Sequence, residues 1–351
     1  GPCLGLLFPA LIATLWALME GVRSLSIYGL PWHLLGYTFA GNVYLIQPAA
    51  YGSVIFISFL GVLLAASFTA GSRKITFFYI MLVAAAFGLS ALRVIAAPEL
   101  KETAKASLYQ TSLRQDAKWQ QPAYQRAAAN FNILKKAPAS SALVLLPETA
   151  FTFVRQSMPN LTEIIDNQSP AHQSVIFGIP NWKNGRYYNA ALSTSGAGDT
   201  LGVFHKQNLV PFGEFIPLKQ LIPGFLQHFA PANTYSAGTT PRFLQTNAGK
   251  ALPVICYEAI FPYHLLRAQR LYSPDFIINL TNDGWFGGTI GGRQHFAIAK
   301  MRSVETGLSQ VRVANRGVSA FIDGYGRVKK RLNSEQSGYL TGSIFEQATA
   351  W

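Results

Sequence analysis

Long hydrophobic runs without charge occupy the first quarter of the chain. No Asp, Glu, Lys or Arg lies between Arg23 and Arg73. Runs at 4–19, 43–72 and 75–92 approach or exceed the roughly 20 residues that a helix needs to cross a bilayer. Core helices of a soluble protein would be the alternative, but three such runs together favour the membrane. We therefore predict transmembrane helices in residues 1–98, with an external loop at about 20–42.

The orientation of these helices follows from the basic residues in their connections. Arg73 and Lys74 lie in the short loop between the second and third runs. Because loops rich in Lys and Arg stay in the cytoplasm, this loop is expected on the cytoplasmic side. The third helix then places residues from 99 onward on the outer side of the membrane.

After residue 98 the pattern changes to short apolar stretches that alternate with longer, partly polar segments. Continuous apolar strands between helices are typical of an α/β domain whose sheets are covered on their outer faces. We predict this domain over 99–351. The expected helices are at 122–136, 262–271 and 293–306, and the expected strands at 106–111, 142–146, 174–179, 188–193, 201–204, 252–257, 275–280, 311–314 and 319–322.

Composition supports the division into two parts. Half of the 351 residues are hydrophobic and only 13% are charged, against roughly 25% charged in soluble globular proteins. The net charge is +13, but the basic residues are scattered and form no stripe that would bind nucleic acid. Attraction to anionic lipid head groups is the favoured use of this charge, and no nucleic-acid partner is expected.

Three of the expected strands end beside a chemically reactive side chain. Glu148 follows the strand at 142–146, Lys206 follows the strand at 201–204, and Cys256 lies near the end of the strand at 252–257. Catalytic residues of α/β domains often lie just past strand ends. A lone cysteine in such a strand can equally be a small hydrophobic core residue. Spacing alone leaves both interpretations open.

The segments around these residues resemble those of the nitrilase, or carbon-nitrogen hydrolase, superfamily. The order of the segments, Glu, then Lys, then Cys, is also that of the superfamily. The matching segments are Leu145-Leu146-Pro147-Glu148, Phe204-His205-Lys206 and Leu252-Pro253-Val254-Ile255-Cys256-Tyr257-Glu258.

Within that superfamily the chain is most similar to the membrane-anchored apolipoprotein N-acyltransferase family. The resemblance implies a nitrilase-like α-β-β-α sandwich after a bundle of transmembrane helices, in a partial chain that lacks the first and last membrane spans. The features that carry it are Lys118-Trp119, Pro147-Glu148-Thr149-Ala150, Tyr188-Asn189, Pro211-Phe212-Gly213-Glu214-Phe215-Ile216-Pro217, Cys256-Tyr257-Glu258, Thr281-Asn282-Asp283-Gly284-Trp285-Phe286-Gly287 and Gln294-His295.

The resemblance also implies a mechanism. Glu148 would be the general base, Cys256 the nucleophile that forms a thioester, and Lys206 the cation that stabilises the oxyanion. A phospholipid would donate the acyl group, and the N-terminal amine of diacylglyceryl-cysteine on an apolipoprotein would accept it. No metal or organic cofactor is expected. The enzyme is expected to be a monomer in the bacterial inner membrane, with its catalytic domain in the periplasm.

Six further residues are candidates for supporting the site or binding substrate. Glu214 is expected to orient Lys206, and Glu258 to support local structure. The aromatic residues Trp119, Tyr257 and Trp285 are candidates for an apolar acyl pocket, although aromatic residues more often serve in packing. Asn189 belongs to the same group of supporting or substrate-binding candidates.

Two histidines lie within the matched segments. His205 and His295 raise the possibility of a metal site or a Cys–His pair, but no clustered ligand spacing supports a metal.

A membrane-tethered amidase of the nitrilase type, which hydrolyses C–N bonds, is the main alternative function. It would use Glu148, Lys206 and Cys256 with water as the second nucleophile. A non-enzymatic binding protein is the second alternative, and the intact Glu148, Lys206 and Cys256 argue against it.

Overall fold

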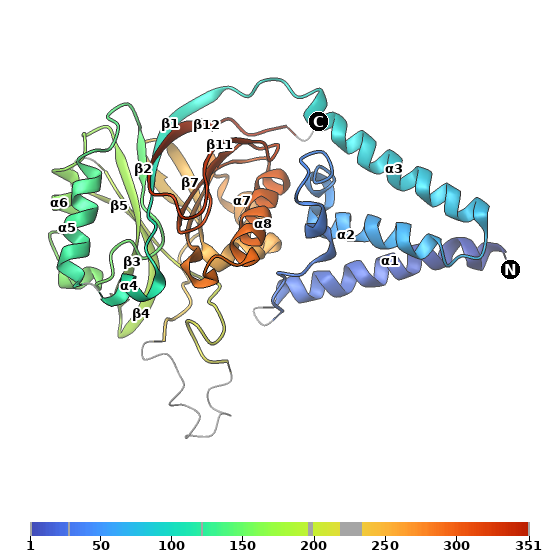
Figure 1. Ribbon diagram of the computed structural model, residues 1–351, viewed down its shortest axis with the longest axis horizontal. Coiled ribbons are helices and arrows are strands. Elements are labelled where there is room, and N and C mark those ends of the chain that lie inside the picture. Colours follow the sequence, from blue (N-terminus) through green and yellow to red (C-terminus); the bar gives the residue numbers. More distant parts are fainter. Residues whose placement is uncertain (1, 27–28, 121, 196–198, 218–233, 350–351) are drawn as a thin grey trace, which may run out of the picture.

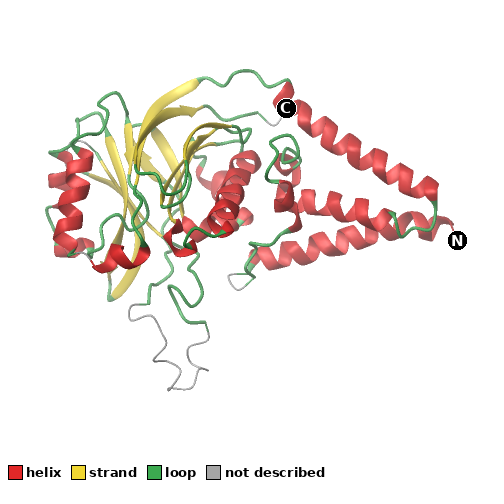
Figure 2. Cartoon of the chain, in the orientation of Figure 1, coloured by secondary structure: helices red, strands yellow, loops and turns green. Residues whose placement is uncertain are grey.

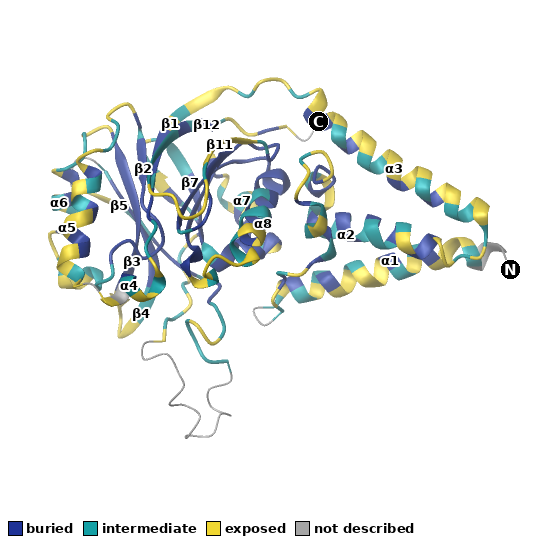
Figure 3. Ribbon diagram, in the orientation of Figure 1, coloured by how far each residue is buried: buried dark blue, intermediate teal, exposed yellow. Residues whose placement is uncertain are grey.

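The computed structural model describes residues 2–26, 29–120, 122–195, 199–217 and 234–349. Three long apolar helices precede an α/β domain and extend from one side of it (Figure 1). They are α1 (Pro2–Leu25), α2 (Ala49–Ser67) and α3 (Arg73–Ile95). By length and composition each can cross a bilayer. Figure 3 shows much of α1 and α3 facing outward, and the exposed side chains include Leu7, Met19 and Phe77.

The second hydrophobic run forms a shorter helix than the sequence predicts. Residues 43–48 of the expected span lie in turns, and α2 begins only at Ala49. The reason is Gln47, whose buried side-chain amide donates hydrogen bonds to the carbonyls of Val43 and Tyr325, at 2.6 and 2.9 Å. This polar anchor ties the start of α2 to the α/β domain.

The first helix is longer than expected and takes up the start of the predicted external loop. Helix α1 continues to Leu25, and a short 3₁₀ helix, η1 (Leu35–Phe39), follows within the connection. The buried Glu20 carboxylate accepts hydrogen bonds from the Trp16 indole and from the Leu35 backbone, at 3.1 and 2.9 Å. The connection therefore folds back onto the helix.

The α/β domain consists of two six-stranded sheets packed face to face. Their strand orders are β12-β1-β2-β3-β4-β5 and β11-β10-β9-β8-β7-β6. The strands are β1 (Glu102–Gln110), β2 (Leu143–Leu145), β3 (Ser174–Lys183), β4 (Arg186–Thr194), β5 (Thr200–His205), β6 (Leu244–Thr246), β7 (Gly249–Ile255), β8 (Phe276–Asn282), β9 (Ser309–Asn315), β10 (Ser319–Ile322), β11 (Val328–Leu332) and β12 (Gly338–Phe345).

Helices cover the outer faces of both sheets and complete an α-β-β-α sandwich (Figure 2). Helices α5 (Ala123–Leu134) and α6 (Leu161–Asp166) pack on the first sheet, and α7 (Pro262–Tyr272) and α8 (Ile290–Thr306) on the second. The core between the sheets contains Leu145 and Ile176 from one sheet and Ile278 and Val311 from the other. The predicted fold class is confirmed.

Helix α8 also joins the sandwich to the membrane helices. The buried Glu305 carboxylate near its end accepts hydrogen bonds from the Ser53 hydroxyl and the Val54 backbone of α2, at 2.7 and 2.9 Å. Helix α2 is kinked at this point, with a φ of +63° at Ser53. The Val54 N–H at the kink thus finds its acceptor in the other part of the molecule.

Candidate active site

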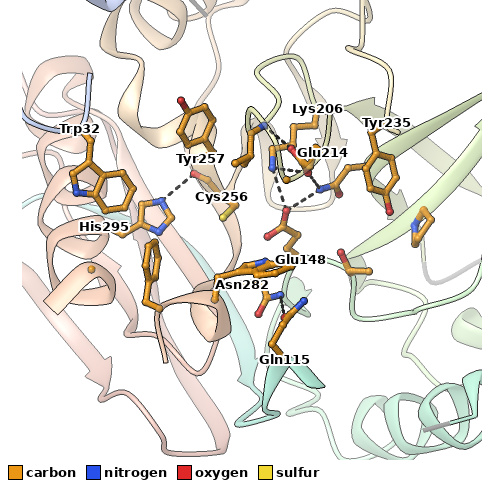
Figure 4. A pocket seen from close by; sticks show the side chains of 18 of the residues that line it. Trp32, Gln115, Glu148, Lys206, Glu214, Tyr235, Cys256, Tyr257, Asn282 and His295 are labelled. Carbon is orange, nitrogen blue, oxygen red and sulfur yellow. Dashed lines mark hydrogen bonds and ion pairs between the residues drawn. The ribbon is translucent and has the colours of Figure 1, made fainter. Parts of the chain in front are cut away.

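Three strand ends bring Glu148, Lys206 and Cys256 to one cavity (Figure 4). Glu148 follows β2, Lys206 comes directly after β5, and Cys256 comes directly after β7. The cavity has a volume of about 880 Å³. The first two residues come from one sheet and the cysteine from the other, so the face-to-face packing of the sheets assembles the group.

Lys206 is a buried cation held by two carboxylates. Its ammonium donates to Glu148 at 3.3 Å and to Glu214 at 2.9 Å, and its side chain is 1% exposed. Burial on its own would lower the pKa of Lys206, but Glu214 and Glu148 outweigh it and raise the pKa above its usual value. Lys206 therefore stays charged throughout the physiological range.

Asn189 fixes the two carboxylates relative to each other. Its side-chain amide donates to Oε1 of Glu148 and to Oε1 of Glu214, both at 2.8 Å. The other oxygen of Glu214 accepts from the Val210 backbone at 2.9 Å. Asn189 also lines the cavity, but its contacts are those of a residue that positions the carboxylates.

Cys256 occupies a strained turn between β7 and the 3₁₀ helix η5 (Cys256–Ile260). The expected strand over 252–257 therefore ends two residues early, at Ile255. The φ of Cys256 is +49°, a conformation that few residues other than glycine adopt and that concentrates at functional sites. Burial, together with the Glu148 charge, raises the pKa of the thiol to about 12 against the opposing effect of Lys206. The resting thiol is protonated and requires a base.

Glu258 holds the loops behind the site together. It is fully buried and accepts hydrogen bonds from the backbone of Ile255 at 2.9 Å and of Gln207 at 2.8 Å. Arg242 pairs with it at 2.9 Å. One carboxylate thus connects the turn before the cysteine with the turn after the lysine.

Lys118 was not among the residues proposed from the sequence. Its ammonium, buried in α4 (Gln115–Gln120), donates to the backbone carbonyl of Glu148 at 2.9 Å. Burial lowers the pKa of Lys118 to about 8, although the Glu148 charge opposes the shift. The available signal was the Lys118-Trp119 motif. The Trp119 side chain lies outside the part of the chain that the structure describes.

Aromatic side chains from both parts of the molecule line the cavity. Tyr257 and Trp285 are among them, the first buried and the second 69% exposed. Trp32, from the connection between α1 and α2, lines it as well and was not predicted. No pattern in the sequence indicates that a loop of the membrane part reaches the catalytic cavity.

The two histidines contact groups other than the sulfur of Cys256. His205 contacts the side-chain amide of Asn181 at 2.7 Å and stacks on Tyr188. His295 contacts the backbone carbonyl of Cys256 at 3.1 Å. Among the residues that the structure describes, no group of three His, Cys, Asp or Glu side chains is arranged to hold a metal ion.

Comparisons with known proteins agree on the family. The Carbon-nitrogen hydrolase family model matches residues 105–351, and that of the Apolipoprotein N-acyltransferase N-terminal domain matches residues 3–67. The apolipoprotein N-acyltransferase of Rickettsia typhi is 32% identical over 97% of this chain and 71% of its own length. That of Brucella melitensis is also 32% identical, over 93% of this chain and 65% of its own length.

Solved structures show the same sandwich. A CN-hydrolase superfamily protein from Xanthomonas campestris matches 69% of this chain and 90% of its own, with a TM-score of 0.52 at 20% identity. A nitrilase-superfamily protein from Saccharomyces cerevisiae matches 72% of this chain and 94% of its own, with a TM-score of 0.53 at 18% identity. Since the family models match both parts of the chain and its relatives match nearly all of it, the chain belongs to the apolipoprotein N-acyltransferase family of the carbon-nitrogen hydrolase superfamily.

Proposed function

We propose that this acyltransferase moves a fatty acyl group from a phospholipid, through a thioester on Cys256, to the N-terminal amine of diacylglyceryl-cysteine on an apolipoprotein. The observation that carries the proposal is the meeting of Cys256, Glu148 and Lys206 in an aromatic-lined cavity beside helices long enough to span a membrane. A cysteine, a base and a buried cation are the groups that acyl transfer requires.

In the first half-reaction, Glu148 takes the proton of the Cys256 thiol, and the sulfur attacks the ester carbonyl of the phospholipid. Lys206 and a backbone N–H near Tyr257 stabilise the tetrahedral oxyanion. The C–O bond then breaks, and Glu148 returns the proton to the oxygen of the departing lysophospholipid. The thiol pKa of about 12 explains why the base is needed at neutral pH.

In the second half-reaction, the α-amino group of the apolipoprotein attacks the thioester carbonyl. Glu148 accepts a proton from the attacking nitrogen, the C–S bond breaks, and the proton passes to the Cys256 sulfur. Both substrates use the same acyl-enzyme in turn, so ping-pong kinetics are expected. Glu214 and Asn189 keep Glu148 and Lys206 in place through both halves.

The lining of the cavity supports a lipid substrate. Tyr257 and Trp285 lie on its sandwich side, and Leu30 and Trp32 on the side of the membrane part. Such surfaces bind apolar chains. The exposed Trp285 is placed to contact a chain at the cavity mouth. A soluble small-molecule amidase would not need a cavity wall supplied by the connection between two membrane helices.

We further propose that residues 1–98 anchor the chain in the bacterial inner membrane and that residues 99–351 form a periplasmic catalytic domain. The positive charges of Arg73 and Lys74 between α2 and α3 support this orientation. We also propose that the enzyme acts as a monomer, because one chain supplies Glu148, Lys206 and Cys256.

A transfer assay tests the function. The detergent-purified chain is mixed with a defined phospholipid and a synthetic peptide that bears an N-terminal diacylglyceryl-cysteine. We expect a peptide heavier by one acyl group, formed by the parent protein and abolished by Glu148→Gln. Release of free fatty acid without acylated peptide would contradict transfer. Hydrolysis of small amides at a higher rate than peptide acylation would favour the amidase.

A further inference from the structure

A buried polar cluster lies directly behind the nucleophile and has no part in the steps above. It consists of Asp283, His295 and Arg312, which are all at most 4% exposed. Asp283 accepts from Arg312 at 2.9 Å and contacts His295 Nδ1 at 2.7 Å. Buried ionic groups are costly unless they are mutually satisfied, so this cluster calls for a specific role.

The cluster reaches the nucleophile through one hydrogen bond. His295 Nε2 lies 3.1 Å from the backbone carbonyl oxygen of Cys256, and the two residues come from different elements, α8 and the start of η5 (Figure 4). A carbonyl oxygen only accepts, so Nε2 carries a proton and donates it. The bond holds the peptide group that follows the strained φ of +49° at Cys256.

Asp283 and Arg312 orient the ring through its other nitrogen. Burial opposes ionisation of Asp283, but Arg312 and His295 outweigh it and hold the pKa of this carboxyl below its usual value. The carboxylate lies 2.7 Å from Nδ1 of His295, and Nη2 of Arg312 lies 3.3 Å from the same atom. With Nδ1 held in this way, Nε2 points at the carbonyl of Cys256.

The membrane part of the chain covers this ring. Trp32 stacks on His295 with ring centroids 5.4 Å apart and an angle of 29° between the planes. The Trp32 indole N–H donates to Gln294 at 3.1 Å. Stacked aromatic rings attract each other. The His295 ring is therefore held by Asp283 at Nδ1 and covered by the connection between α1 and α2.

We propose that His295 is a positioning residue for the nucleophile, which holds the strained Cys256 turn in place through the hydrogen bond to the Cys256 carbonyl. The contribution of His295 to acyl transfer rests on the proposed function, whereas its effect on the reactivity of the Cys256 thiol does not. Asp283 and Arg312 keep the ring oriented, and Trp32 couples that orientation to the membrane part.

The test measures how fast iodoacetamide alkylates Cys256 in the full chain, followed by intact mass in a Cys3→Ser background. His295→Leu removes the donor to the Cys256 carbonyl, whereas His295→Gln can restore one. His172→Gln is the matched control, because His172 Nε2 also contacts a backbone carbonyl, that of Ala139, at 2.7 Å, but at the surface. Thermal unfolding of each variant is recorded in parallel.

We expect His295→Leu to slow alkylation roughly tenfold, since a buried carbonyl that loses its donor costs on the order of 1.4 kcal/mol. His295→Gln should recover part of that rate, and His172→Gln should match the parent. If His295→Leu does not fold, His295→Phe, which keeps a ring but has no donor, is used instead and should also slow the reaction. Parent-like alkylation in folded His295→Leu, or in His295→Phe where the former is unfolded, would overturn the proposal.

The outcome remains separate from that of the proposed function, because alkylation uses no acyl donor or acceptor. A slow alkylation rate in His295→Leu would support the positioning role of His295 even if no phospholipid served as donor. Conversely, normal alkylation together with normal acyl transfer in this variant would remove the role of His295 and leave the acyltransferase mechanism intact.

Discussion

At the scale of single residues, the proposed chemistry depends on a balance of buried charges around Glu148. Lys206 lies on one side of its carboxylate and Lys118 donates to its backbone carbonyl. Glu214 places a second negative charge next to the Lys206 ammonium. Glu148, Lys206, Cys256 and their partner Glu214 could all be proposed from motifs. Lys118 stands in a motif too, but its role could not be predicted, because a lysine in a helix is usually solvated and the sequence does not show which carbonyl it will meet.

Replacing Glu214 by Gln tests this balance. Lys206 would lose the nearer of its two carboxylates, and a hydrogen bond to a charged group contributes about 1.5–3 kcal/mol. We expect acyl-enzyme formation to slow by roughly ten- to a hundredfold. Single-turnover kinetics with phospholipid would measure it. Glu335→Gln is the control, since Glu335 pairs with Arg316 at 2.6 Å on the surface. Equal rates for the two variants would contradict the role of Glu214.

Lys118 gives the stability of the protein a defined dependence on pH. Its folded pKa is about 8, against an ordinary value of 10.5. Below pH 8 Lys118 is protonated in both the folded and the unfolded chain. The folded chain then bears the full free-energy cost of burying the charged ammonium. Between about pH 8 and 10.5 the unfolded chain binds more protons, so the contribution of Lys118 to folding stability rises with pH.

The matching measurement compares the melting temperatures of the parent and of Lys118→Met at several pH values. The difference, parent minus variant, should increase between pH 7.5 and 9.5. Comparing the two proteins cancels the other titrating groups. A difference that stays constant over this range would show that Lys118 is not the buried, weakly basic amine described here.

At the scale of elements, strands with apolar runs were predictable and strands without them were not. β10 (Ser319–Ile322) has the expected bounds, whereas β6, β11 and β12 have no counterpart in the prediction. β11 reads Val-Lys-Lys-Arg-Leu and is almost wholly exposed at a sheet edge. Its polar sequence pairs with the backbone of β10 and packs only Leu332 against the core, so hydrophobic periodicity gives no signal for it.

Contacts between elements far apart in the chain could not be predicted from the sequence either. The Glu305 carboxylate of α8 caps the kinked part of α2 and also pairs with Arg302 at 3.0 Å. We expect Glu305→Ala to cost about 3–5 kcal/mol, because it leaves the buried Arg302 guanidinium without its carboxylate and the Ser53 and Val54 donors without their acceptor. Thermal unfolding in detergent would show it. Glu346→Ala, at an exposed carboxylate, serves as the control, and a similar small effect in both would exclude the capping role.

At the scale of the whole molecule, the membrane part and the sandwich together build the cavity. Sequence patterning separated the two parts near residue 98, because charge returns to the chain there. It did not indicate that Trp32 would reach the catalytic cavity, since that contact joins residues more than 200 positions apart in the chain. The division near residue 98 stays a prediction from the sequence, and the contact between the two parts gave no signal there.

The proposed orientation can be tested by labelling single cysteines in a chain that lacks Cys3 and Cys256. Thr69→Cys, beside the loop between α2 and α3, should react with a membrane-impermeant maleimide only after the cells are opened. Ser334→Cys, on the exposed surface of the sandwich, should react from the periplasm. Labelling of both sites from the same side would contradict the positive-inside assignment.

The measurement that tests the central claim most directly is the intact mass of the purified protein after incubation with phospholipid alone. We predict a gain of one fatty-acyl group that hydroxylamine removes and that Cys256→Ala lacks. Such an adduct would identify the thioester on Cys256. Folded protein that transfers acyl groups to a diacylglyceryl peptide yet never carries this adduct would contradict the account.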